Sequence, residues 1–322
     1  MSNRIPQHDV TGQINLENPY AVAQAIDTVL GARYGAAWNR RLLWKAFNDV
    51  ARAFRGDYPG LLACDTPYHD LHHTLDTALV MARLVDGYEA RQAEEGHPLG
   101  PDLALAGVLL ALFHDIGFLR RSGAEADLSG AALAPHHEAR SVEFTKAYLM
   151  GTELAEYAPL AELIHATAFH QDPAALLEAY PAAHVWVGRM VGTADLLSQI
   201  ADPFYIEKCH DFLYWEFVMG GLDRTRAPDG REIVLYASAE DLLRKTPGFF
   251  QGLVLKRLSD DFANAHRYLK IHFGGRDPYM AAAIASISYL KTVLAKNDFS
   301  TLRDPPPPLL AADIESAPLV EK

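Results

Sequence analysis

One apolar run most constrains what this chain can fold into. The residues from Leu103 to Phe113 are all apolar or small, and His114 and Asp115 follow them directly. Such a run is typical of a buried helix, which would carry two polar side chains to the edge of a core. Without partners there they would destabilise the fold, whereas a metal ion would use both as ligands. His114-Asp115 therefore indicates a metal site, and a buried, hydrogen-bonded His-Asp pair is the simpler alternative.

The composition is that of an acidic globular protein. The 322 residues carry a net charge of −12, and 49% of them are hydrophobic. This charge argues against a nucleic-acid polymer or a membrane as partner, although a metal ion can still attract phosphate to an acidic protein. The two cysteines have no CxxC spacing, which disfavours a disulfide framework or a thiolate zinc site. We expect no signal peptide and no apolar run of the ~18 residues that span a bilayer, and therefore a cytoplasmic protein.

Helical patterns dominate, and we expect an all-α fold with a single large multi-helix domain. The expected domain covers residues 18–302, after a loose leader over residues 1–17 and before a disordered, proline-rich tail over residues 303–322. The only short β-prone run is 231–236. The expected long helices cover residues 18–30, 36–54, 71–93, 103–115, 137–150, 153–170, 182–200, 204–219, 248–270 and 277–296. Asp172-Pro173 should open a further short helix, and residues 238–241 resemble a capped helix start.

Further metal-ligand residue types lie before and after the apolar run. His69 and His73 are four residues apart, which places them on one helix face, although they could also be solvated histidines at a helix start. Asp195 lies in the apolar segment 191–197 and needs a partner there, which could be a metal, a salt bridge or a cap. His165 and His170 are five residues apart, so we expect at most one of them to point at a shared site.

A set of histidine and aspartate ligands suits zinc, iron or manganese, and its carboxylates also admit magnesium. Asp115 could bridge two ions ~3.5–4 Å apart, the two-metal arrangement that serves phosphoester hydrolysis. The paired His136-His137 precedes Glu138, and this segment could contribute to the site or simply be a solvated helix start.

The order His73, His114-Asp115, Asp195 resembles the signature of the HD-domain metallophosphohydrolase superfamily. Within that superfamily, roughly residues 20–300 resemble the catalytic domain of class I cyclic-nucleotide phosphodiesterases. The first matching segment, Tyr68-His69-Asp70-Leu71-His72-His73, is similar to that family's Tyr-His-Asn-x-x-His. The other matching segments are His136-His137, Ala166-Thr167 before His170, Ala194-Asp195-Leu196, and the substrate-clamp segment from Lys245 to Leu253.

The resemblance implies an HD/phosphodiesterase-type helical domain with a binuclear metal centre and a role for each matching residue. A metal-bridging hydroxide would attack phosphorus, and His69 would protonate the leaving alkoxide as general acid. Asp115 would bridge from the first ion to the second. The first ion would be held by His73, His114, Asp115 and Asp195, and the second-metal shell would draw on His136, His137, Thr167, His165 and His170. Substrate would contact Tyr68, Thr246 and Phe249, the last by stacking on the base.

Three residues depart from the phosphodiesterase pattern. Asp70 replaces an asparagine, and Phe118 stands where that family has a further histidine after the His-Asp pair. Thr246 occupies the position of the glutamine that reads the purine edge, and threonine cannot reproduce a bidentate amide contact. These departures concern the substrate and leave the metal-ligand set complete.

The sequence thus predicts a metal-dependent phosphohydrolase with two divalent metal ions, drawn from Zn, Mg, Mn or Fe. Its partner would be a small-molecule phosphate ester or nucleotide, such as a cyclic nucleotide, and a homodimer is compatible with the sequence. One alternative is a di-iron HD-type oxygenase, in which His137, His165 and His170 would supply extra ligands. The other is a non-catalytic HD ligand-binding module.

Overall fold

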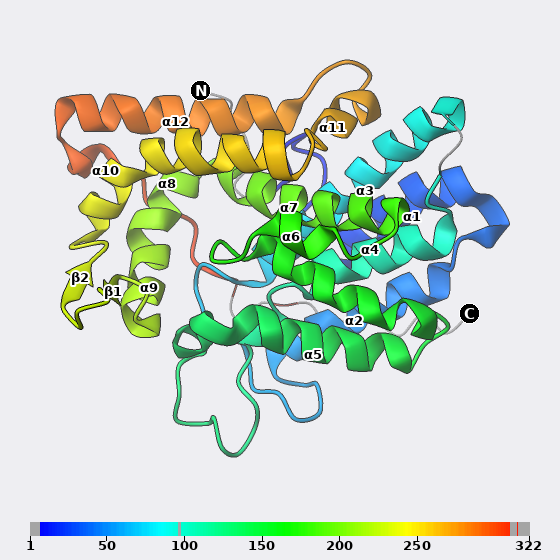
Figure 1. Cartoon of the computed structure of the whole chain (residues 1–322), viewed down its shortest axis with the longest axis horizontal. Coiled ribbons are helices and arrows are strands. Elements are labelled where there is room, and N and C mark those ends of the chain that lie inside the picture. The colour runs from blue at the N-terminus through cyan, green and yellow to red at the C-terminus, as the bar shows by residue number, and fades with distance from the viewer. Residues whose placement is uncertain (1–6, 96–97, 310–313, 315–322) are drawn as a thin grey trace.

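The apolar run forms helix α4 (Pro101–Phe113), and every residue from Leu103 to Phe113 is buried in the computed structural model. Pro101 stands in the first turn, where its missing N–H costs no hydrogen bond. Neighbours on several sides explain why the helix has no polar face. These neighbours are α2 (Arg40–Arg55), α3 (Leu71–Glu95), α5 (His137–Met150), α7 (Ala182–Ala201) and the 3₁₀ helix η4 (Ala155–Thr167) (Figure 1).

The structure describes residues 7–95, 98–309 and 314. Within these residues the chain is a mostly helical single domain, with 67% helix, twelve α-helices and two short strands. The remaining elements are α1 (Pro19–Tyr34), α6 (Pro173–Leu177), α8 (Tyr205–Lys208), α9 (Tyr214–Gly220), α10 (Ala239–Phe249), α11 (Arg267–His272), α12 (Pro278–Lys296) and the antiparallel strands β1 (Arg224–Arg226) and β2 (Glu232–Val234). The hairpin lies at the same end of the molecule as α9 and α10 (Figure 1).

Some expected α-helices have a different local geometry. The segment expected to be helical over 153–170 is the 3₁₀ helix η4, which contains Pro159. Proline lacks the N–H that an α-helix needs and clashes with the preceding turn, which explains the tighter geometry. The segments expected over 204–219 and 248–270 are interrupted by π-helical turns, namely η5 (Cys209–Leu213), η6 (Phe250–Val254) and η7 (Arg257–Asp261).

The leader, expected to be loose, is anchored in its described part. Asp9 is fully buried, and its carboxylate pairs with Arg83 of α3 at 2.6 Å. Although burial raises the pKa of the Asp9 carboxyl, the Arg83 charge outweighs burial and holds it below its usual value. Leu16 packs in the hydrophobic core. A buried charge pair fixes this segment to the domain, and residues 1–6 lie outside the described residues.

The segment after residue 302 also lies against the domain as far as it is described. Arg303 pairs with the buried Glu207 of α8 at 2.8 Å, and the Leu309 amide donates to Asp70 Oδ2 at 3.3 Å. In place of the expected disorder, residues 303–309 thus have charged and backbone groups bonded to two buried carboxylates of the domain. The rest of the expected tail, residues 310–313 and 315–322, lies outside the described residues.

We expected no apolar run long enough to cross a membrane, yet one described segment reaches that length. The 18-residue window Pro101–Phe118 is apolar enough by composition, and 89% of it is buried inside the protein. A helix that is buried among other helices of the same domain shows this pattern. The window therefore corresponds to the core helix α4 and the turn that follows it.

The packing of α3 against α11 can be tested at a glycine. A Cβ at Gly87 would overlap the backbone carbonyl of Tyr268, whereas a Cβ at Gly248 of α10 would meet nothing within 4 Å. We expect Gly87→Ala to lower the free energy of unfolding by about 2 kcal/mol or more. The control Gly248→Ala should leave it unchanged or raise it by up to ~1 kcal/mol, because alanine favours a helix. Urea denaturation measures both, and a Gly87→Ala protein as stable as the wild type would contradict this packing.

Candidate metal centre and adjoining cavity

Three helices bring metal-ligand side chains to one point. His73 lies in the first turn of α3, His114 follows the last residue of α4, and Asp195 lies in the middle of α7. All three side chains are buried, and one ligand atom from each lies within 4.8 Å of the others. This group could hold a metal ion. Its members are separated widely in sequence, so the packing of α3, α4 and α7 assembles it.

The distances within this metal corner, which we define as His73, His114, Asp115 and Asp195, suit a common ion. His73 Nε2 lies 3.2 Å from His114 Nε2 and 3.3 Å from Asp195 Oδ1, and His114 Nε2 lies 3.5 Å from Asp195 Oδ1. Asp115 Oδ2 lies 3.1 Å from His114 Nε2 and 3.3 Å from His73 Nε2. Ligand atoms about 2.1 Å from a tetrahedral ion would lie about 3.4 Å from each other.

Hydrogen bonding within the corner also fits a metal. Asp115 Oδ2 is buried and has no hydrogen-bond partner among the described residues, although buried polar atoms almost always have one. The Nδ1–H of His114 can donate to the Ala111 carbonyl at 2.8 Å, so that in the neutral imidazole Nε2 is the nitrogen without a proton, and Nε2 lies beside the corner carboxylates. A metal-binding histidine is typically fixed by such a bond from its other ring nitrogen. The donor set therefore matches what an ion requires.

The ionisation of the corner reflects its dense charge. Burial lowers the pKa of His73, but the adjacent carboxylates of Asp115 and Asp195 outweigh burial and raise it to about 9. Burial would raise the pKa of Asp195, yet the adjacent imidazoles of His114 and His73 bring it below its usual value. Two carboxylates in a buried site thus attract positive charge, which protons or a metal cation can supply.

A second position with ligand atoms lies beside the corner. His137, the first residue of α5, has its Nε2 atom 3.6 Å from Asp115 Oδ1, the oxygen that faces away from the other histidines. Its Nδ1–H can donate to the Ala134 carbonyl at 2.6 Å, so Nε2 is free to act as a ligand. Burial lowers the pKa of His137 and favours the neutral imidazole that metals bind.

His69 has a carboxylate partner that sequence reasoning missed. Its Nδ1 lies 2.5 Å from Oε2 of Glu216, a buried residue of α9 whose other oxygen accepts the Tyr68 amide at 2.6 Å. Burial alone would lower the pKa of His69, but the Glu216 carboxylate outweighs it and raises this pKa. A lone acid in the aromatic segment 212–217 was the available signal, by the same reasoning that identified Asp195.

Phe118, one of the departures from the phosphodiesterase pattern, packs against two histidine rings. Its ring stacks on His69 with centroids 4.3 Å apart and on His137 with centroids 4.3 Å apart. Phe118 belongs to the 3₁₀ helix η2 (Ile116–Phe118), which directly follows Asp115. The aromatic ring therefore helps to fix the planes of both imidazoles, where a histidine would have offered a further polar group.

The corner opens into a cavity of about 560 Å³. Of the residues predicted from sequence, the cavity wall includes His69, Asp115, His137, Asp195, Tyr68, Thr167, His170, Thr246 and Phe249. His73 and His114 lie behind this wall, within the corner. His170 is mostly exposed and lies 4.0 Å from Glu138, so the structure places it away from the corner's ligand atoms. The packing thus gathers most of the predicted site residues around one space.

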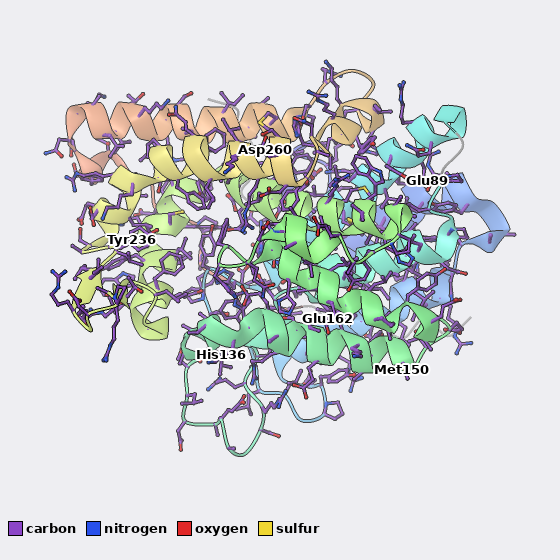
Figure 2. All side chains as sticks on the ribbon, viewed as in Figure 1. Glu89, His136, Met150, Glu162, Tyr236 and Asp260 are labelled. Carbon is purple, nitrogen blue, oxygen red and sulfur yellow. The ribbon has the colours of Figure 1, made fainter. Side chains whose placement is uncertain are left out.

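Two predicted second-metal residues do not reach the cavity. His136 is exposed at the start of α5 (Figure 2), one residue before His137, and a helix cannot direct two consecutive side chains at one point. His165 pairs with Gln171 at 3.0 Å and lies 3.7 Å from Glu162, outside the cavity wall. The structure therefore brings His137 to the site and leaves His136 and His165 out of it.

Fold and site together define a helical single-domain protein with a buried candidate metal site beside a large cavity. The chain belongs to the Npun_R2479-like family, whose model matches residues 122–289. A search of curated proteins finds no match. The matched stretch includes His137, Asp195 and Glu216 but begins after Asp115, and neither comparison gives an HD-domain or phosphodiesterase match. The resemblance to those proteins therefore rests on the residues of the site themselves.

The metal corner predicts a loss of bound metal when one ligand is removed. We expect His114→Ala to lower the metal content of the purified protein to a small fraction of the wild-type value. His136→Ala is the matched control and should leave it unchanged, because His136 is exposed. Removing metal with a chelator should also lower the free energy of unfolding, by about 2.7 kcal/mol where the ion was present at 100 times its Kd.

Elemental analysis measures the first effect, and thermal unfolding with and without chelator measures the second. A His114→Ala protein that retains the wild-type metal content would contradict this assignment of the corner.

Proposed function

We propose that this protein is a metal-dependent phosphohydrolase of HD type that acts on a small phosphate ester. The observation that carries the proposal is that the two carboxylates of the metal corner and the imidazole of His69 lie on the wall of one cavity. Hydrolysis of a phosphate ester needs both elements, since one activates water and the other stabilises the leaving group. The order of the residues in sequence supports the same class.

The corner's own residues would hold the ions. His73, His114, Asp115 and Asp195 supply two imidazoles and two carboxylates for the first ion, and Asp115 would share its second oxygen with a second ion beside His137. When bound, divalent ions such as Zn, Mg, Mn or Fe lower the pKa of water and neutralise charge on a phosphoryl group. The backbone carbonyls of Ala111 and Ala134 fix the tautomers of two of these imidazoles.

His69 would act as the general acid. Glu216 accepts from Nδ1, so Nε2 is the nitrogen left to face a substrate in the cavity. Because Glu216 raises the pKa of His69, it favours the protonated imidazole, which can transfer its proton to a leaving alkoxide oxygen. Stacking on Phe118 keeps the ring in a fixed plane, which limits the reorientation needed during transfer.

A di-iron oxygenase of HD type is the second candidate, and the position of His137 beside Asp115 favours it. A second imidazole-ligated iron would suit oxygen activation. However, His165 lies outside the cavity, and the His69–Glu216 pair serves proton donation to a leaving group. Oxygen-dependent turnover of an iron-loaded sample without ester hydrolysis would select this candidate. A non-catalytic binding module would show neither reaction with any metal.

Hydrolysis should depend on Asp115, the carboxylate that both ions would share. We expect Asp115→Ala to lower kcat/KM for bis(p-nitrophenyl) phosphate by at least about 100-fold, because both ions lose an oxygen ligand. Asp102→Ala, at an exposed residue near the start of α4, is the carboxylate control and should retain activity. Initial rates after loading with each candidate metal measure this. Equal rates for Asp115→Ala and the wild type would overturn the proposal.

The pH dependence of hydrolysis should reflect the pKa of His69, which its partner Glu216 raises. A general acid acts while protonated, so activity falls as pH rises through the pKa of His69. Glu216 raises that pKa, so Glu216→Gln should lower it and move the alkaline limb of the kcat/KM profile to lower pH. Activity at low pH should fall much less than activity at high pH.

The profile is measured on a phosphodiester with a poor alkoxide leaving group, for which proton donation matters. A mutant whose alkaline limb stays at the wild-type pH would exclude His69 as the group that titrates there.

A further inference from the structure

The cavity wall combines two chemically distinct sets of side chains. One set is the metal corner with His69 and His137, and the other is a wall of hydrocarbon and aromatic side chains. That apolar wall, as we call it, comes from α7, η5, α9, α10 and η6 and includes Leu196, Leu213, Phe217, Leu242, Phe249 and Leu253. A wall of this kind gains free energy by taking apolar surface out of water.

Two polar side chains next to this wall, Thr246 and Lys245, already have partners within the protein. Thr246, at the position where the phosphodiesterases read a purine edge, donates its hydroxyl to the Leu242 carbonyl at 2.9 Å. Lys245 Nζ donates to the Leu235 carbonyl at 2.6 Å and lies 2.8 Å from Asp241 Oδ2. The Thr246 proton and two of the three Lys245 N–H groups are therefore already used within the protein.

Gln199, the one side-chain amide in the described cavity wall, also has hydrogen-bond partners within the protein. Gln199 donates from Nε2 to Asp195 Oδ1 at 2.6 Å and accepts from the Tyr68 hydroxyl at 3.0 Å, within the wall that the structure describes. It lies at the metal corner and positions one of its carboxylates. A purine placed against the apolar wall would leave its ring nitrogens and exocyclic groups without partners, which lowers affinity strongly.

Aromatic and aliphatic residues continue to the surface around the cavity. Phe169 and Phe249 meet edge to face with centroids 5.3 Å apart, and Phe217 stacks on Tyr236 with centroids 5.7 Å apart. Phe169 and Leu235 are 45% and 39% exposed, although both line the cavity. Figure 2 shows Tyr236 at the end of the molecule that carries the hairpin. Exposed apolar side chains at a cavity's edge are typical of a binding site for an apolar group.

We propose that the organic group of the substrate is apolar, so that this protein acts on phosphate esters of hydrophobic alkyl or aryl alcohols and not on nucleotides. The inference rests on the phosphohydrolase function proposed above and names its substrate class. The phosphate would lie at the metal corner, and the hydrocarbon would extend along Leu213, Phe217 and Phe249. A volume of about 560 Å³ is within the range of cavities that enclose a ligand of this size.

A series of alkyl p-nitrophenyl phosphates from methyl to octyl tests the substrate class with the metal-loaded full chain. The p-nitrophenolate leaving group is the same throughout, so only the buried alkyl group changes. We expect kcat/KM to rise roughly threefold for each added methylene until the cavity is filled. A flat or falling series would overturn the proposal, and so would a kcat/KM for cyclic AMP or cyclic GMP above that of the hexyl ester.

Two variants test whether the alkyl group binds in the cavity. Phe249→Ala removes part of the apolar wall and should flatten the dependence on chain length. Ile284→Ala is the matched control, because this α12 residue is 53% exposed and lies outside the cavity wall. It should keep the wild-type dependence. Equal slopes for the two variants would place alkyl binding outside the cavity and overturn the proposal.

Binding of alkylphosphonates, which are not hydrolysed, separates failure of this inference from failure of the proposed function. Calorimetric titration should show affinity rising with chain length. If affinity rises but no ester is hydrolysed with any metal, the phosphohydrolase function is refuted and the apolar ligand class stands. If esters are hydrolysed without any dependence on chain length, the apolar class is refuted and hydrolysis stands.

Discussion

The approach of two imidazole nitrogens and two carboxylates at the end of α4 is the constraint on which the rest of the structure depends. A buried helix that ends in His114-Asp115 cannot leave those groups without partners. The first turn of α3 and the middle of α7 supply His73 and Asp195 to the same point. The tight packing of α4 against both helices is therefore also what fixes the geometry of the site.

Much of the metal corner and of the helix arrangement could be predicted from the sequence, because the sequence patterns that indicate them are local. A run of apolar residues into His-Asp identifies the corner, and an acid within residues 191–197 identifies its partner on α7. Helical periodicity and Pro or Gly boundaries gave α3, α4, α5, α7 and α12 closely. Ligand type and helix phase are properties of short segments, so they can be inferred without knowledge of the tertiary fold.

The parts that could not be predicted depend on contacts across the fold. Glu216 reaches His69 from α9, 147 residues later, and no local pattern links the two. His136 and His137 are adjacent in sequence, yet only the geometry of the junction between the 3₁₀ helix η3 (Gly130–His136) and α5 decides which one lies beside Asp115. Arg303 and Asp9 likewise anchor segments whose composition suggested looseness, because their charged partners Glu207 and Arg83 lie far away in sequence.

The central claim is that the corner binds metal, and anomalous X-ray diffraction from crystals of the purified protein tests it most directly. Data collected above and below the absorption edge of the metal identified by elemental analysis would locate each ion. The account predicts an anomalous peak about 2.0–2.3 Å from Nε2 of His73 and His114 and from an oxygen of Asp195. A corner closed by direct histidine–carboxylate hydrogen bonds, with no anomalous peak in metal-saturated crystals, would contradict it.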